Sequence, residues 1–206
     1  RVRRLVVSDD AQARVVWLAA AAAACGVGAH VVGKAARDAL FVSTFPPSAL
    51  PYVFLATGLC MGTAVAIYAR VQSRWSPHTT SPRLPLVVAA SLVAAWFGLR
   101  TRCPASAGVL YIWLTISGGL VISAFWSLLS EVFDVRTARR TIGTLTVASS
   151  VGGLVGSAAT YGLLAVVDAR TLVLPVAVLH VLIAICMRGM AKAQRGDTER
   201  RPTERA

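Results

Sequence analysis

Three charged residues near position 35 have the types and spacing of an anion-binding site. Lys34, Arg37 and Asp38 follow one apolar stretch and precede another apolar run, residues 39–42. If a helix continues through them, Lys34 and Asp38 share a face and Arg37 lies close to it. Basic side chains at the outer mouth of a helix bundle could bind an anionic substrate. The alternative is an interfacial cluster whose basic side chains reach lipid headgroups, with Asp38 balancing a positive neighbour.

A second charge cluster combines residues that could pair and close a transport path. It combines two carboxylates with three guanidinium groups: Glu131, Asp134, Arg136, Arg139 and Arg140. Because Glu131 directly continues an apolar run, we predict that it pairs with Arg139 or Arg140 and closes a transport path from the cytoplasmic side. The alternative is ordinary anchoring of two helix ends at the membrane interface.

His180 is a candidate because it lies well inside an apolar stretch, where ionisable residues are usually functional. We expect a neutral imidazole with a backbone partner. Intramembrane serine proteases of the rhomboid family pair such a histidine with a Gly-x-Ser-Gly motif. Ser117 precedes a glycine here, but Thr115 stands where the first glycine of that motif should be. We therefore expect that the protein is not an enzyme and has no catalytic residues.

Metal and cofactor chemistry is not indicated by the sequence. The four cysteines have no CxxC spacing, and no P-loop, GxGxxG or HExxH motif occurs. The cysteines are Cys25, Cys60, Cys103 and Cys186. We expect small buried thiols, no metal ligands and no cofactor.

The elements that position these residues are predicted to be transmembrane helices. Of the 206 residues, 56% are hydrophobic and only 15% charged, whereas a soluble domain carries about 25% charged residues. A bilayer core needs about 20 helical residues, and the third and sixth apolar stretches must recruit neighbours to reach that length. The six stretches without Lys, Arg, Asp or Glu are 15–33, 50–69, 85–99, 107–130, 142–167 and 172–187. The sequence therefore predicts an all-α, polytopic membrane protein with six transmembrane helices.

The basic residues predict the orientation of these helices. Of the 21 Lys and Arg residues, 16 fall on the side that holds both chain ends. Because cytoplasmic segments carry the excess of positive charge, we expect both termini in the cytoplasm, with the chain in a bacterial inner membrane. The net charge of +12 then reflects topology, so we expect the lipid bilayer as a partner and no nucleic acid.

Small residues indicate where helices pack closely. Gly58 and Gly62 on the second stretch, and Gly152 and Gly156 on the fifth, have the i, i+4 spacing that lets helix backbones approach in lipid. The alternative is a direct role in a substrate path. The third and sixth stretches lack such glycines, which suits helices that face lipid.

Two segments resemble the ADP/ATP translocase family of plastids and intracellular bacteria. In the first, residues 34–54, Arg-Asp-Ala-Leu at 37–40 matches that family's basic residue followed by Asp, a small residue and an apolar run. In the second, residues 125–143, a Phe-Trp pair is followed by Ala-Arg-Arg at 138–140 and a glycine. This order is similar to the family's junction between its fourth and fifth helices.

The resemblance implies a fold and a function. The family has the major facilitator architecture of two six-helix halves, so the chain resembles an N-terminal half whose first and fourth helices line a central site. Arg37 would then face the substrate, and Glu131 with Arg140 would form part of the inner gate. The implied activity is transport of a small anionic or nucleotide-like solute by alternating access, which needs a second six-helix half or a second copy as partner.

We expect three parts along the chain: a cytoplasmic tail over 1–14, a six-helix transmembrane domain over 15–190 and a disordered basic tail over 191–206. The alternative function is a non-transporting six-helix scaffold or a truncated, inactive transporter remnant. The start at Arg1 without Met and the absence of a second half favour this alternative, whereas the charged motifs between helices favour transport.

Overall fold

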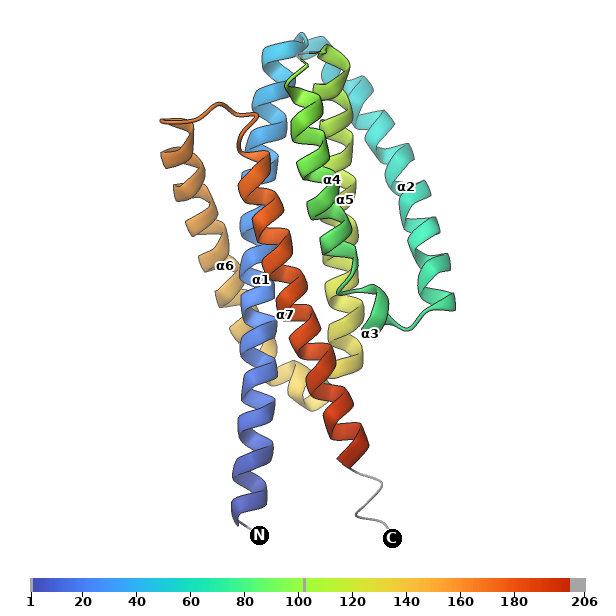
Figure 1. The fold of residues 1–206 in the computed structure, drawn as a ribbon, viewed down its shortest axis with the longest axis vertical. Helices are drawn as coiled ribbons and strands as arrows, with labels where there is room; N and C mark the ends of the chain where they lie inside the picture. The colour runs from blue at the N-terminus through green and yellow to red at the C-terminus, as the bar shows by residue number, and fades with distance from the viewer. Residues whose placement is uncertain (1, 102, 201–206) are drawn as a thin grey trace.

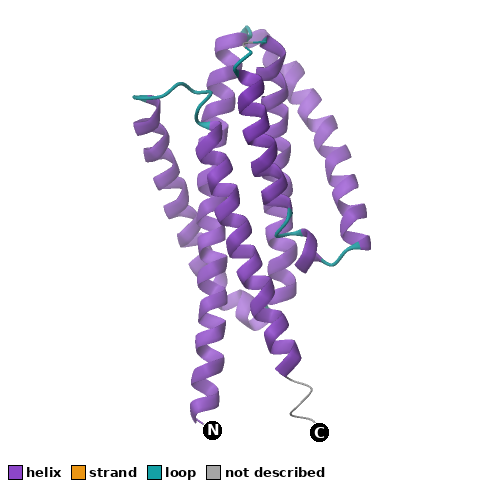
Figure 2. Ribbon diagram, viewed as in Figure 1, coloured by secondary structure: helices purple, strands orange, loops and turns teal. Residues whose placement is uncertain are grey.

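Helices make up every regular element in the described part of the chain (Figure 2). The computed structural model describes residues 2–101 and 103–200, and side chains over 12–101 and 103–193. The elements are α1 (Val2–Thr44), the short η1 (Pro47–Ala49), α2 (Leu50–Arg74), α3 (Pro77–Thr80), α4 (Leu84–Leu99), α5 (Pro104–Val132), α6 (Val135–Leu164) and α7 (Val173–Arg200). This confirms the all-α prediction.

Six helices within the described residues are long and apolar enough to cross a membrane. Four of them contain a predicted apolar stretch completely, while the fifth stretch runs three residues past its span and the sixth begins one residue before its span. The chain therefore has the build of an integral membrane protein. The third span shows how a short stretch is completed. The 16 residues of α4 rise only about 24 Å, and the neighbouring α3 extends the span to Pro77–Leu99.

Prolines and one carboxylate mark where helices begin. Pro47, Pro77 and Pro104 occupy first turns, where the missing N–H group costs little because it would have no intrahelical partner. Asp134 instead caps α6 with its side chain. The expected boundary near residue 14 lies inside α1, and α7 continues past residue 190 to Arg200. Residues 201–206 of the expected C-terminal tail lie outside the described residues.

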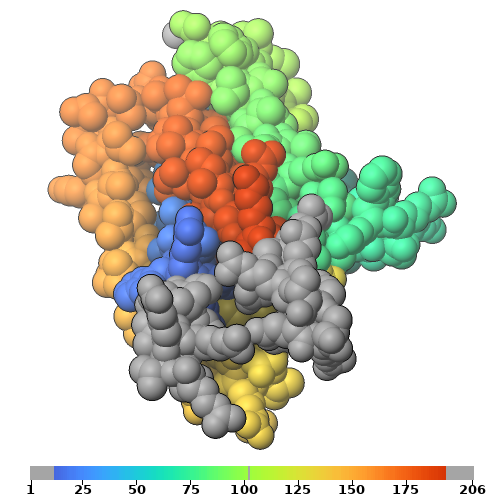
Figure 3. Space-filling model, turned by 60° about the horizontal axis from the view of Figure 1, so that its bottom comes forward, coloured from blue at the N-terminus to red at the C-terminus, as the bar shows by residue number. Residues whose placement is uncertain are grey.

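The first helix is the centre of the bundle. α1 packs against α5, α6 and α7, while α4 packs against α7 and α5. α2 contacts mainly α5, and it stands away from the rest of the bundle on the side opposite α6 (Figures 1 and 3). The beginning of α1 and the end of α7 lie at the same end of the bundle, here named the terminal end (Figure 1).

Close packing of α6 on α1 depends on glycine. A Cβ atom at Gly152 would collide with the backbone of Ala24, and one at Gly156 would lie 3.0 Å from the Cα of Gly28. These two glycines thus lie where the packing interpretation requires them. Gly58 and Gly62 do not, because a Cβ atom on either would have no atom within 4 Å. The reason is the position of α2, which buries only Val53 and Thr57.

The more buried spans are not the ones that the glycine pattern suggested. α4 and α7 lack small-residue stripes, yet Val88, Leu92, Val176 and Ile183 on these helices are almost completely buried. The expectation that these two helices face lipid is therefore wrong for much of their surface. α2 and α6 are the more exposed helices, and Tyr161 on α6 is 84% exposed. Branched side chains fill the α4–α7 contact without the close backbone approach that glycine permits.

Candidate functional site

Arg37 is held between two helices. Its Nε donates to Asp38 Oδ1 at 3.1 Å, and its Nη1 donates to the Thr115 hydroxyl on α5. The guanidinium carbon lies 4.6 Å from the centroid of the Tyr111 ring, one turn from Thr115. The Arg37 side chain is only 12% exposed. Contacts to α5 therefore orient the guanidinium group across the bundle.

The aromatic ring that supports Arg37 is itself fixed by packing. Tyr111 lies 5.1 Å from Phe41, centroid to centroid, and these two residues form a small buried cluster with Val53 of α2. Thr115 donates its own hydroxyl proton to the Tyr111 carbonyl at 2.8 Å, so its lone pairs remain available to accept from Arg37. Three helices thus contribute to the position of one guanidinium group.

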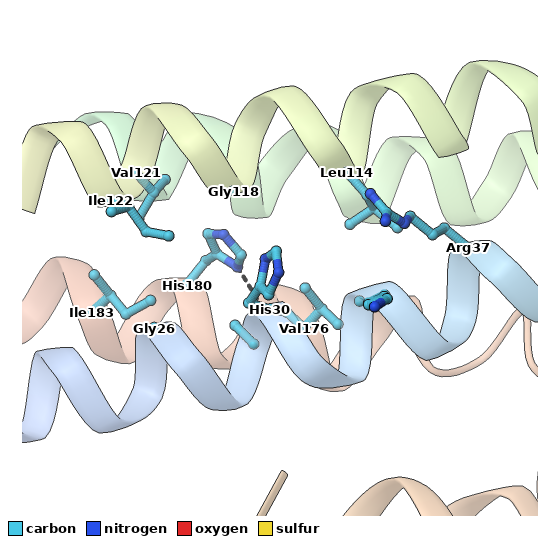
Figure 4. Close-up of a pocket in the computed structure, with 13 residues that line it drawn as sticks. Gly26, His30, Arg37, Leu114, Gly118, Val121, Ile122, Val176, His180 and Ile183 are labelled. Carbon is cyan, nitrogen blue, oxygen red and sulfur yellow. Dashed lines mark hydrogen bonds between the residues drawn. The ribbon is translucent and has the colours of Figure 1, made fainter. Parts of the chain in front are cut away.

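A pocket with about 450 Å³ of empty space, its open mouth included, lies between α1, α5 and α7 (Figure 4). The residues from α1 repeat at three- and four-residue intervals, so they share one helix face. From Gly26 to Arg37, 11 helical steps, the pocket follows α1 for about 16 Å. Its nitrogen-bearing side chains are His30, Lys34, Arg37 and His180. No Asp or Glu is among the described residues that line it.

The two histidines lie side by side in this pocket and both point toward α5 (Figure 4). His180 is 4% exposed, and its Nδ1 lies 2.8 Å from the Val176 carbonyl oxygen. Because a carbonyl only accepts, Nδ1 carries the proton, and Nε2 of the neutral ring is left as an acceptor. His180 therefore has the backbone partner that we expected.

His30 is the pocket residue that the sequence analysis missed. Gly118 on α5 makes room for it, because a Cβ atom there would lie 3.6 Å from His30 Nδ1. The available signal was its spacing, four residues before Lys34 and seven before Arg37, which places all three on one face.

The arrangement of Ser117 does not match a serine nucleophile. Its hydroxyl donates to the Leu114 carbonyl at 3.4 Å, and it is buried. Gly118, rather than Ser117, lines the pocket beside His180. The absence of enzyme activity remains an expectation.

A second, apolar cavity with about 890 Å³ of empty space adjoins the first. It lies between α1, α5 and α6, and it shares Gly26, Val121, Ile122 and Ile183 with the basic pocket. Phe125 and Trp126, the aromatic pair of the second resemblance segment, form part of its wall. The two cavities together follow α1 from the basic pocket toward the terminal end.

The expected gate residues do not form a single cluster. Glu131 Oε2 lies 2.9 Å from His78 Nε2 on α3, so the contact that the structure describes for Glu131 is with His78 and not with the predicted partners Arg139 or Arg140. The chain turns at Phe133 and Asp134, after which α6 packs on α1. The basic residues at the start of α6 therefore lie beside α1. Arg136 and Arg140 line an open pocket beside Gln12 of α1, and Arg139 is exposed.

Asp134 has a local structural role in this arrangement. Its Oδ1 accepts from the Thr137 N–H group at 2.9 Å, which is the contact of a helix N-cap. The hydrogen bonds from Thr137 lower the pKa of the Asp134 carboxyl group below its ordinary value. The carboxylate therefore stabilises the start of α6.

Comparison with known proteins identifies no relative: no family model, curated protein or solved structure matches this chain.

Proposed function

We propose that the chain is one six-helix half of a membrane transporter for a small anionic solute. The observation that supports it most is the pocket between α1, α5 and α7, whose described lining includes four nitrogen-bearing side chains and no carboxylate. Ionisable groups are expensive within a membrane and mark substrate paths there. An anion in the pocket would offset the positive charge of Lys34 and the part of the Arg37 charge that Asp38 does not balance.

The hydrogen bonding of Arg37 suits this role. A guanidinium group has five N–H donors. Asp38 and Thr115 use two of them in the described structure, so three can reach a ligand. Such a fork binds carboxylate or phosphate in a bidentate manner, which Lys cannot do.

In alternating access, one six-helix half can supply a binding site for the solute, but it cannot enclose a complete path across the membrane. Transport of this kind needs a second bundle that rocks against the first about a central site. The basic pocket lies between the first and fourth spans, as the resemblance to the ADP/ATP translocase family implies, and the apolar cavity extends it along α1. The partner in this proposal is a second six-helix half or a second copy, in a bacterial inner membrane with both termini cytoplasmic.

Uptake into proteoliposomes tests the proposal. The purified chain, together with a second half where one is co-expressed, would be assayed with labelled ADP, ATP, inorganic phosphate and a dicarboxylate. We expect Arg37→Gln to lower uptake of the transported anion by roughly ten- to a hundredfold, because a charged hydrogen bond is lost. Arg37→Lys should retain part of the activity, and Arg74→Gln, on the exposed side of α2, should retain all of it.

Two outcomes would contradict the proposal. Equal uptake by wild type and Arg37→Gln would remove Arg37 from the site. Failure of every anion to bind or enter, with folded protein in the vesicles, would favour the alternative of a non-transporting scaffold or an inactive remnant.

A further inference from the structure

A second basic pocket lies at the terminal end of the bundle, between α3, the start of α4 and α7. It has about 670 Å³ of empty space and shares no lining residue with the pocket around Arg37. Its walls are formed by His78, Thr79, Pro82, Arg83, Arg188, Ala191 and Lys192. Residues more than 100 positions apart thus meet in one pocket.

Three permanent positive charges converge here. Arg188 and Lys192 are four residues apart on α7 and therefore share a face. Arg83 directly precedes α4. Like charges at this spacing repel each other unless an anion or water lies between them. No carboxylate lines the pocket among the described residues, so the pocket is suited to an anionic ligand.

His78 adds a fourth polar group. Its Nε2 contacts Glu131 at 2.9 Å, which orients the ring. Its Nδ1 is buried and has no hydrogen-bond partner among the described residues.

The position of the pocket relative to the membrane distinguishes it from an ordinary surface patch. Arg188 and Lys192 lie at the end of the sixth span, Val173–Ala193, and His78 and Arg83 lie at the start of the third, Pro77–Leu99. Both positions mark the boundary between bilayer core and water, where lipid phosphates lie.

Apolar surface continues from the basic residues toward the bilayer core. On α7, Val181, Ile185, Arg188 and Lys192 follow helical spacing, and Ile185 is 57% exposed. On α4, Val87 lies one turn beyond Arg83 and is 60% exposed. Basic groups at the interface with exposed apolar side chains beyond them match the two parts of a phospholipid.

We propose that this pocket binds the phosphate group of an anionic phospholipid headgroup, with the acyl chains along the exposed apolar faces of α4 and α7. Basic pockets between transmembrane helices on the cytoplasmic side bind such headgroups. This inference is independent of transport, since it uses none of the residues around Arg37.

Lipid retention by the full chain tests the proposal. Wild type and Arg188→Gln/Lys192→Gln would be purified from nanodiscs that contain phosphatidylglycerol or only phosphatidylcholine, and bound lipid would be counted by native mass spectrometry. We expect wild type to retain phosphatidylglycerol selectively. The double variant should bind it roughly tenfold or more weakly, because each basic residue near anionic lipid contributes about a few-fold to tenfold.

Two control variants keep the result interpretable. Arg70→Gln/Arg74→Gln removes the same charge from α2 at the same end of the bundle, outside this pocket, and should leave retention unchanged. Arg188→Lys/Lys192→Arg keeps both charges and should retain the lipid, which separates a lost contact from lost folding. Equal losses in the α2 variant and the α7 variant would overturn the proposal in favour of diffuse surface attraction.

A second arm identifies the source of the phosphate. Inorganic phosphate at millimolar concentration, added to delipidated wild type in detergent, should raise the thermal unfolding midpoint less than phosphatidylglycerol does. If phosphate alone produces the whole effect, with no gain from the lipid, the pocket is a site for soluble phosphate and the lipid proposal is wrong.

Discussion

At the residue scale, the surroundings of Arg37 differ from those of a side chain that only reaches lipid headgroups. Its guanidinium group contacts Thr115 and Tyr111 on the neighbouring α5 and is only 12% exposed. These contacts restrict the rotamers of a long side chain before a ligand arrives. Restricting them in advance reduces the entropy that binding would otherwise cost.

Thr115 is expected to position Arg37 for anion binding. Thr115→Val keeps the side-chain shape but removes the hydroxyl acceptor, so binding of the proposed anionic substrate should weaken by roughly two- to tenfold. Thr115→Ser keeps the hydroxyl and should bind nearly as wild type. Calorimetric titration with the anion that wild type binds measures the difference, and equal affinity of all three proteins would show that this contact does not matter.

Asp134 is expected to stabilise α6 in a pH-dependent way. Its pKa is lowered in the folded protein, so its contribution is present above the unfolded pKa of about 4 and is lost as pH falls through the lower folded value. Asp134→Ala should lower the thermal unfolding midpoint at pH 7, and this loss should shrink on acidification. Asp134→Asn, which can still cap the helix, should lose less. A deficit of Asp134→Ala that stays constant from pH 7 to pH 3 would contradict this role.

At the element scale, the contact between α6 and α1 depends on the absence of side chains. The fifth span has little other support, because α6 lies at one side of the bundle and packs mainly on α1 (Figure 1). In lipid the hydrophobic effect does not hold helices together, so van der Waals contact between backbones carries much of the association. The position of α6 is therefore sensitive to single methyl groups.

Gly152→Ala should displace α6, because the new Cβ atom would meet the backbone of Ala24, which cannot move like a flexible side chain. We expect a destabilisation of about 1–3 kcal/mol or more, as for overpacked sites. The matched control is Gly162→Ala on the same helix, where a Cβ atom meets nothing within 4 Å. Its effect should be small or stabilising, since alanine favours helix. Unfolding in detergent measures both, and equal stability of the two variants would contradict the close contact.

At the scale of the whole molecule, six spans require that both chain ends lie on one side of the membrane. The beginning of α1 and the end of α7 do lie at the same end of the bundle (Figure 1). Among the described residues, basic side chains at that end include Arg83, Arg188 and Lys192 of the second basic pocket. The charge asymmetry that predicts orientation thus also supplies the residues of that pocket.

Single cysteines test the orientation. In a background with the native cysteines replaced, Arg74→Cys lies at the terminal end of the bundle and Asp168→Cys in the turn after α6 at the opposite end. A membrane-impermeant maleimide should label Asp168→Cys in intact cells and Arg74→Cys only after permeabilisation. Labelling of Arg74→Cys in intact cells would reverse the proposed orientation.

The number and helical type of the membrane spans follow from the sequence alone, because the apolar stretches and the charges between them can be read along the chain. A stretch of about 20 apolar residues between basic segments must form a helix in lipid, where every backbone group needs an internal partner. This reasoning located all six spans, and helical spacing placed Lys34 and Arg37 on one face. The backbone partner of His180 could be expected in the same way, since a buried ring nitrogen needs a hydrogen bond.

Only the tertiary structure decided which helix faces meet. Glu131 was expected to pair with residues close in sequence, but the divergence of α6 from α5 leaves it beside His78. Gly58 and Gly62 have the same spacing as Gly152 and Gly156, yet only the second pair contacts another backbone. The tilt and rotation of each helix depend on how all its side-chain volumes fit against its neighbours, and spacing within one segment does not contain that information. The same reason explains why Arg83 joins Arg188 and Lys192, more than 100 residues away.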